Sequence, residues 1–107
     1  MNDLITVLNA TLAQAQSALN DMRTEGVAHA RAKAEYRKAL ARKILELRKE
    51  GFPATYIPEL ARGDDLVAEK CFERDCAEIR YNAARETVLL RKKEADTLRE
   101  QIAREWQ

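Results

Sequence analysis

Acidic side chains clustered in the second half of the chain are the residues best suited to chemistry. The cluster consists of Glu69, Glu73, Asp75 and Glu78. Carboxylates of this kind on two helices can hold paired Mg²⁺, as in all-α nucleotide pyrophosphatases. The segment expected to face them carries the cations Arg37, Lys38, Arg42 and Lys43. We expect these cations to form salt bridges with the acids, so the sequence predicts no metal site and no cofactor.

The residue types needed for covalent catalysis are present but badly spaced. Ser17 and His29 are the only serine and histidine, and their separation of twelve residues along one helix excludes a hydrogen bond. Cys71 and Cys76 are the only cysteines, and on a helix they point about 140° apart. Neither a disulfide between them nor a shared metal fits that geometry. We therefore predict a protein that is not an enzyme.

The elements that position these residues are two long helices. The chain has 107 residues, enough for one domain, and contains only three glycines and two prolines. Four of these five breakers lie in the segment 51–63, which reads GFPATYIPELARG. The sequence thus predicts an all-α fold: a helix over about 3–50, a turn over 51–64 and a helix over about 65–106. A connection this short makes the helices antiparallel neighbours, as in a coiled-coil-like hairpin.

Apolar spacing gives a predicted register for this hairpin. If the turn is symmetric, residues whose numbers add up to about 114 face each other, so Leu12 meets Ile102 and Leu8 meets Trp106. The stripe expected on the second helix contains Val67 or Ala68, Phe72, Cys76, Ile79, Ala83, Leu90, Leu98, Ile102 and Trp106. Residues 23–50 carry nine basic and four acidic side chains, whereas residues 64–86 carry four basic and seven acidic ones. Opposite charge favours pairing of the two arms.

The first 22 residues predict self-association. Their only charges are Asp3 and Asp21, and a surface of small uncharged side chains suits burial against another subunit. The residues expected at this oligomer seam are Ile5, Leu8, Leu12, Leu19 and Met22. A two-helix hairpin has a thin core, so we expect a dimer or higher homo-oligomer that forms a helical bundle.

The middle of the first helix allows three interpretations. The stripe can slip in phase to Val27, Ala30 and Ala34, with or without a break near Gly26. Alternatively, His29 can form a buried polar layer with Glu86. The third interpretation is a ligand site at the subunit interface, suited to a small anionic nucleotide. Its residues would be His29, Lys33, Tyr81 and Arg85.

Other partners are constrained by composition and charge. A net charge of +1 and acidic neighbours around Arg91-Lys92-Lys93 make nucleic acid a less favoured partner. Phe52 and Tyr56 in the turn either plug the end of the hairpin or form a partner-binding tip. No stretch approaches the roughly 20 apolar residues of a membrane span, and we expect a cytoplasmic protein with no membrane contact.

The segment from Tyr36 to Trp106 resembles small uncharacterised helical-hairpin proteins of phages and prophages of Gram-positive bacteria. The residues that carry the likeness include Leu47-Arg48, Gly51-Phe52-Pro53, Leu60-Ala61-Arg62-Gly63, Ala77-Glu78 and Arg104-Glu105-Trp106. The resemblance implies a role in the host cytoplasm as a binder that sequesters or inhibits a host factor, such as a host protein or a nucleotide immune signal. Alternatives are a replication or recombination accessory that contacts DNA or a DNA-binding protein and, third, a metal-dependent nucleotide hydrolase.

Overall fold

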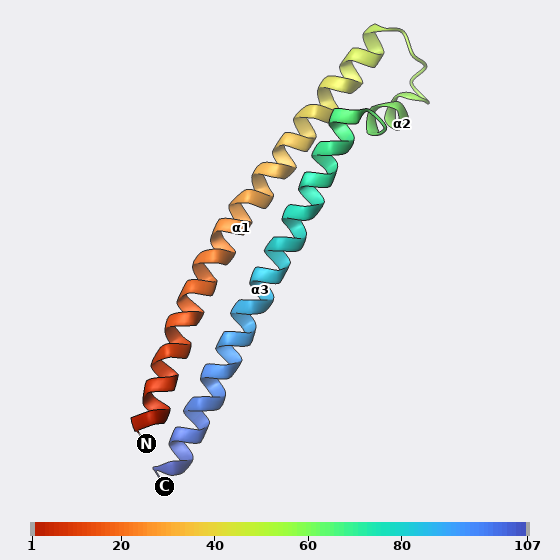
Figure 1. The fold of residues 1–107 in the computed structure, drawn as a ribbon. Helices are drawn as coiled ribbons and strands as arrows, with labels where there is room; N and C mark the ends of the chain where they lie inside the picture. Colours follow the sequence, from red (N-terminus) through yellow and green to blue (C-terminus); the bar gives the residue numbers. More distant parts are fainter. Residues whose placement is uncertain (1, 107) are drawn as a thin grey trace. The chain divides into compact units, whose positions relative to one another are not determined.

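A computed structural model describes residues 2–106 and is all-α (Figure 1). Helix α1 spans Asn2–Lys49, α2 spans Ile57–Arg62 and α3 spans Asp65–Glu105. The described residues contain no strand. The predicted all-α class with two long helices is confirmed. Helix α1 continues through Gly26 without interruption.

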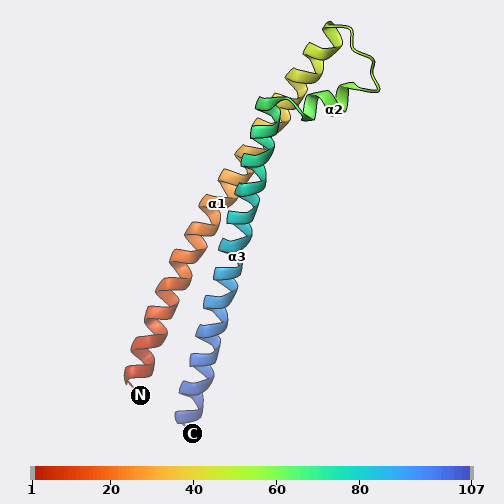
Figure 2. The same ribbon diagram turned by 45° about the vertical axis from the view of Figure 1, so that its right-hand side comes forward.

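The chain forms two compact units. The terminal unit consists of the chain up to Gly26 and from Arg80 onward, and the tip unit consists of Val27–Ile79. Within each unit the α1 and α3 segments run side by side in opposite directions in both views (Figures 1 and 2). The antiparallel pairing predicted from the short connection is therefore present in both units.

Helix α1 ends in a hydrogen-bonded glycine cap. Gly51 has φ +86°, a left-handed conformation that glycine adopts without steric cost. Its amide donates to the carbonyl of Arg48 at 3.1 Å, and the amide of Phe52 donates to the carbonyl of Leu47 at 3.2 Å. This pair of bonds is the Schellman motif, which satisfies carbonyls left unpaired at a helix end. Arg48 and Lys49 in the last turn add favourable charge.

The short helix α2 covers the end of α1. Ile57 and Ala61, which are 5% and 0% exposed, form a core cluster with Leu47. Leu40 and Ile44 of α1 pack against the same cluster. The connection therefore folds back along α1 and supplies the main apolar core of the tip unit.

Asp64 caps the start of α3 and ties it to α1. Its carboxylate accepts a hydrogen bond from the amide of Val67 at 3.2 Å and forms an ion pair with Lys43 at 3.4 Å. The Val67 amide, together with the Lys43 ammonium, lowers the pKa of the Asp64 carboxyl below its ordinary value. Asp64 pairs with Lys43, which lies well before the end of α1. The start of α3 therefore lies beside Lys43 and not beside the end of α1.

This asymmetric connection makes the predicted register wrong. The numbers of paired residues add up to about 107 and not 114, as in Gly26 with Tyr81 and Lys43 with Asp64. The shift is one heptad, or about 10 Å along a helix. Leu12 lies opposite Ala95 instead of Ile102. Trp106 is 71% exposed, so it does not close the end of the hairpin against Leu8 as predicted.

We predict that Ile57→Ala destabilises the protein by about 2–4 kcal/mol, because it removes a buried side chain and leaves a cavity in the only core cluster of the tip. Thermal or urea unfolding followed by circular dichroism measures the loss. The matched control is Leu60→Ala in the same helix, where the side chain is 42% exposed and the expected change is within about 0.5 kcal/mol. Equal losses for the two variants would contradict the role assigned to α2.

We also predict a pH-dependent effect of Asp64→Asn, which keeps a capping side chain but removes its charge. A lowered folded-state pKa means that the charge of Asp64 stabilises the fold above the ordinary carboxyl pKa of about 4. This contribution is lost as the pH falls through the lowered value. The wild type should therefore exceed the variant in free energy of unfolding at pH 7, and the difference should shrink as the pH falls below about 4. The exposed neighbour Asp65, changed to Asn, is the control, and an Asp64→Asn difference that persists at low pH would refute this account.

Candidate interaction surface

The seam between the helices of the terminal unit is built from small side chains. Its most buried members are Thr11 and Ala18 of α1 and Val88 and Ala95 of α3. Each helix repeats its buried or half-buried residues at alternating steps of three and four, which is the heptad pattern of a coiled coil. The most buried positions of the seam are therefore occupied by small residues, and larger apolar residues such as Leu8 and Ile102 are only half-buried in it.

The stripe predicted for α3 runs along the wrong face of that helix. Phe72, Ile79 and Leu90 are 64%, 68% and 54% exposed. Phe72 lies two residues before the half-buried Arg74, which places it about 160° away around the helix. The sequence holds two heptad stripes on α3 that both contain apolar residues, and the stripe with Phe72, Ile79 and Leu90 is the one that points outward. Predicted members Val67, Leu98 and Ile102 do lie in the seam.

On α1 the predicted stripe is displaced by only one residue. Ile5, Leu12 and Leu19 each follow a seam position and are spaced seven residues apart. Ile5 and Leu12 remain 39% and 37% exposed, and Leu19 is half-buried. The other two predicted members, Leu8 and Met22, are half-buried seam residues. The residues beside the seam therefore form a row of larger apolar side chains along one edge of the helix pair.

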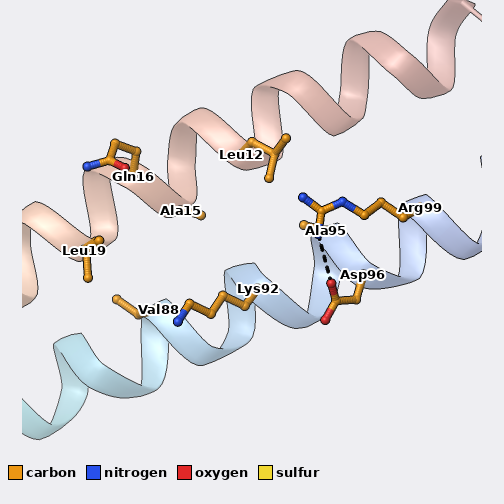
Figure 3. A pocket seen from close by; sticks show the side chains of 9 residues that line it. All are labelled: Leu12, Ala15, Gln16, Leu19, Val88, Lys92, Ala95, Asp96 and Arg99. Carbon is orange, nitrogen blue, oxygen red and sulfur yellow. Dashed lines mark hydrogen bonds and ion pairs between the residues drawn. The ribbon is translucent and has the colours of Figure 1, made fainter.

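This row borders an open groove of about 400 Å³ in the terminal unit (Figure 3). Its apolar residues are Leu12, Ala15 and Leu19 from α1 and Val88 and Ala95 from α3. Figure 3 shows the apolar side chains of the two helices pointing toward one another across it. A groove of this composition fits the apolar side of a helix.

Polar side chains form the edge of the groove. Lys92 and Arg99 of α3 lie seven residues apart, and Gln16 lies on α1. Arg99 is held by an ion pair with Asp96 at 3.2 Å. Long cationic side chains can cover apolar surface with their methylene groups while the charge stays in water. The groove thus has an apolar floor and a solvated edge.

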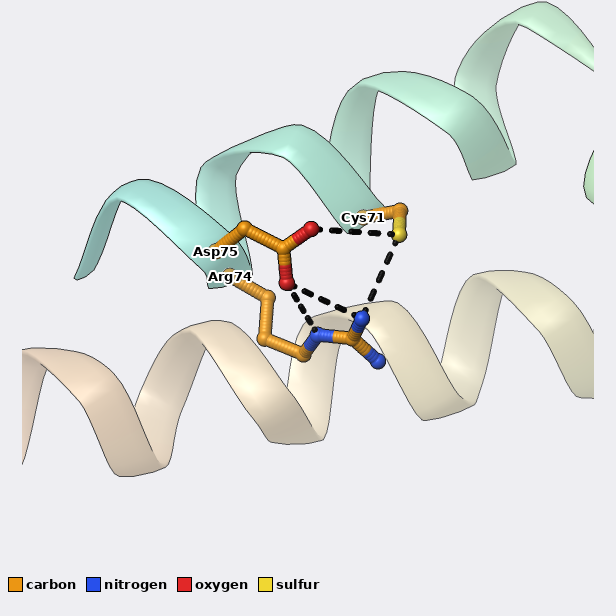
Figure 4. A network of polar contacts seen from close by, with 3 residues as sticks. All are labelled: Cys71, Arg74 and Asp75. Carbon is orange, nitrogen blue, oxygen red and sulfur yellow. Dashed lines mark hydrogen bonds and ion pairs between the residues drawn. The ribbon is translucent and has the colours of Figure 1, made fainter. Parts of the chain in front are cut away.

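A polar layer that was not predicted lies in the seam of the tip unit. The guanidinium of Arg74 lies 4.4 Å from the ring centroid of Tyr36. It also lies 3.0 Å from the Asp75 carboxylate (Figure 4). It also donates to the sulfur of Cys71 at 3.4 Å. The hydrogen bond to Asp75 raises the pKa of Arg74. The pair Tyr36–Arg74 is recognisable from the sequence only when the register is known, because both are seam positions.

The turn aromatics do not plug the hairpin. Phe52 and Tyr56 are 43% and 62% exposed, and Ile57 with Ala61 fills the position expected for them. The plug interpretation is therefore wrong for Tyr56. The next residue, Ile57, is the one that points inward. Together with Leu60, the two aromatics form an exposed apolar tip on the connection. Whether this tip binds a partner stays a prediction.

The three interpretations of the middle have different outcomes. The phase slip is wrong, because Val27 is 61% exposed and Ala30 and Ala34 are exposed. The polar layer of His29 with Glu86 and the nucleotide site stay predictions, since each joins residues from the two units. In the nucleotide site, His29 and Lys33 belong to the tip unit and Tyr81 and Arg85 to the terminal unit.

The acidic cluster is distributed differently from the prediction. Glu73 and Asp75 form ion pairs with Lys70 and Arg74 of their own helix. The predicted salt bridges to the cations of α1 are therefore wrong for these two acids. In the part of the chain that the structure describes, no three acidic, histidine or cysteine side chains come together as metal ligands.

No helix in the described part of the chain is long and apolar enough to span a membrane. No protein family, curated protein or solved structure matches the chain.

Proposed function

We propose that this protein is a non-enzymatic helical binding protein that self-associates through the groove of its terminal unit. Ile5, Leu12 and Leu19 would contact a second copy and complete a helical bundle. In this assembly the protein acts by holding a partner and not by transforming a substrate. Sequestration or inhibition of a host factor is the role that the sequence resemblance adds to this proposal.

The distribution of apolar side chains carries the proposal. Among the described residues, five of the nine buried hydrophobic residues are alanines, whereas fourteen large hydrophobic residues are at least 37% exposed. Fully burying one large apolar side chain contributes about 1.5–3 kcal/mol. Because the buried positions are mostly small residues, burial within one chain yields little hydrophobic stabilisation. The exposed large apolar residues contribute theirs only when a partner covers them. Association is therefore the activity that this composition favours.

The location of the interface follows from charge. Exposed apolar residues near the tip have charged neighbours, but the first 22 residues contain only Asp3 and Asp21 as charges. Burying a charge without a partner is costly, so a nearly uncharged helix face is the easiest surface to cover. This face contains Ile5, Leu12 and Leu19 and adjoins the groove of Figure 3.

The exposed tip provides a surface for a different partner. Phe52, Tyr56 and Leu60 lie within nine residues and each is at least 42% exposed. Aromatic residues of this kind are enriched at the centres of protein interfaces. A host protein with an apolar pocket is the partner class that fits this tip.

The test is the double variant Leu12→Glu/Leu19→Glu, which places two charges in the groove. We predict that the wild type is a homo-oligomer at micromolar concentration and that this variant is a monomer by light scattering after size exclusion. The control is Ala13→Glu/Asn20→Glu, which adds the same charges one residue further along on the side away from the seam. The control should keep the oligomer, and circular dichroism should show helices in all samples. A monomeric wild type would refute the proposal, and so would a groove variant that keeps the oligomer.

A further inference from the structure

The tip unit has two outward faces of opposite charge that its own hairpin leaves unused. Residues 27–49 of α1 carry eight basic and two acidic side chains, whereas residues 65–79 of α3 carry five acidic and two basic ones. The ion pair Lys43–Asp64 joins the two helices, but Glu73 and Asp75 pair within α3. Most of the opposite charges on the two helices of the tip unit therefore do not pair across the hairpin.

The outward face of α1 combines small residues with cations. This face contains three residues spaced seven apart, Val27, Ala34 and Ala41. Each has a seam residue two positions before it and another two positions after it, so its side chain points away from α3. All three are exposed. The surrounding cations are also exposed and have no ion-pair partner among residues 2–106. They are Arg31, Arg37, Lys38 and Arg42.

The outward face of α3 combines large apolar residues with acids. Phe72 and Ile79, also seven residues apart and two residues from seam positions, are 64% and 68% exposed. The half-buried Cys76 lies between them on the same stripe. Glu69 lies beside this stripe, and Glu78 lies on the flank of α3 between the stripe and the seam. Both are exposed and likewise lack an ion-pair partner in the described part of the chain.

The two faces are complementary in shape and in charge. Large side chains at a seven-residue spacing on α3 match small side chains at the same spacing on α1, as knobs match holes in helix packing. Unpaired acids around the first set match unpaired cations around the second. Because both faces point away from the seam, they cannot meet within one chain.

We propose that the outward face of α3, centred on Phe72 and Ile79, docks on the outward face of α1, centred on Ala34 and Ala41, of a second copy of this chain. The contact is heterologous, since it joins two different surfaces, and repetition of it produces a ring or a filament. It is separate from the groove of the terminal unit and does not depend on the function proposed above. With both contacts formed, the assembly contains more than two copies.

A second copy accounts for both faces, whereas nucleic acid would account only for the cations. Phosphate binding requires a surface that is basic overall. In the tip unit the acids of α3 and the cations of α1 belong to one compact body, and the whole chain has a net charge of +1. The exposed Phe72 and Ile79 have no role in a phosphate contact.

Charge reversal with complementation in the full-length protein tests the proposal. One variant carries Arg31→Glu, Arg37→Glu, Lys38→Glu and Arg42→Glu, so both of its outward faces are acidic. The other carries Glu69→Lys and Glu78→Lys, so both of its faces are basic. The control, Glu100→Lys with Glu105→Lys, matches the second variant in net charge but changes exposed residues of the terminal unit. Sedimentation velocity gives the size of the assembly, and circular dichroism checks that each variant is folded.

Each variant alone should lose the species larger than a dimer, with at least about a tenfold weaker association. An equimolar mixture should restore these species, because each acidic face then meets a basic one. The control should behave as the wild type. Mixing that restores nothing, or a wild type that never exceeds a dimer, would overturn this contact while leaving the dimer of the terminal unit intact. Binding of a 20-nucleotide single strand that is lost in the first variant, with assembly unchanged, would overturn it in favour of nucleic acid.

Discussion

The packing of α2 against the end of α1 is the constraint on which the rest of the structure depends. Ile57 and Ala61 bury themselves against Leu47, so the connection folds back along α1 before α3 begins. This sets the register of the two long helices, and the register decides which seam residues lie opposite each other. A connection without this packing would shift α3 by a heptad and bring a different set of residues together.

Features that depend on neighbouring residues could be predicted from the sequence, and the register could not. The helix ends follow from local chemistry, as with Gly51 after the cationic last turn of α1 and Asp64 before α3. The register depends on where α2 packs, which is a tertiary contact. The seam of α3 was misassigned because its apolar residues form two heptad stripes, and periodicity alone does not tell which stripe faces α1. For the groove, the row of Ile5, Leu12 and Leu19 was evident from spacing, but its α3 edge required the correct register.

Small, large and charged side chains occupy different places in this structure and have different roles. Alanines such as Ala18 and Ala95 let the two helices approach each other closely. Many of the larger apolar residues, such as Phe72 and Ile79, lie outside the seam and are exposed. In the proposed assembly, charges near the tip would select which contacts form, whereas the nearly uncharged start of α1 is a surface that is easily covered. On the proposed account, folding and association draw on the same hydrophobic effect, because a thin internal core would be completed by apolar contacts with a second copy.

The central claim is that association completes the core of this protein, and its most direct test is the dependence of thermal stability on concentration. Unfolding should be followed by circular dichroism over a hundredfold range of protein concentration, from about 1 to 100 μM. If folding is coupled to association, mass action requires the midpoint temperature Tm to rise with concentration. A Tm that stays constant over this range would show that the isolated hairpin is stable alone, and would contradict the account.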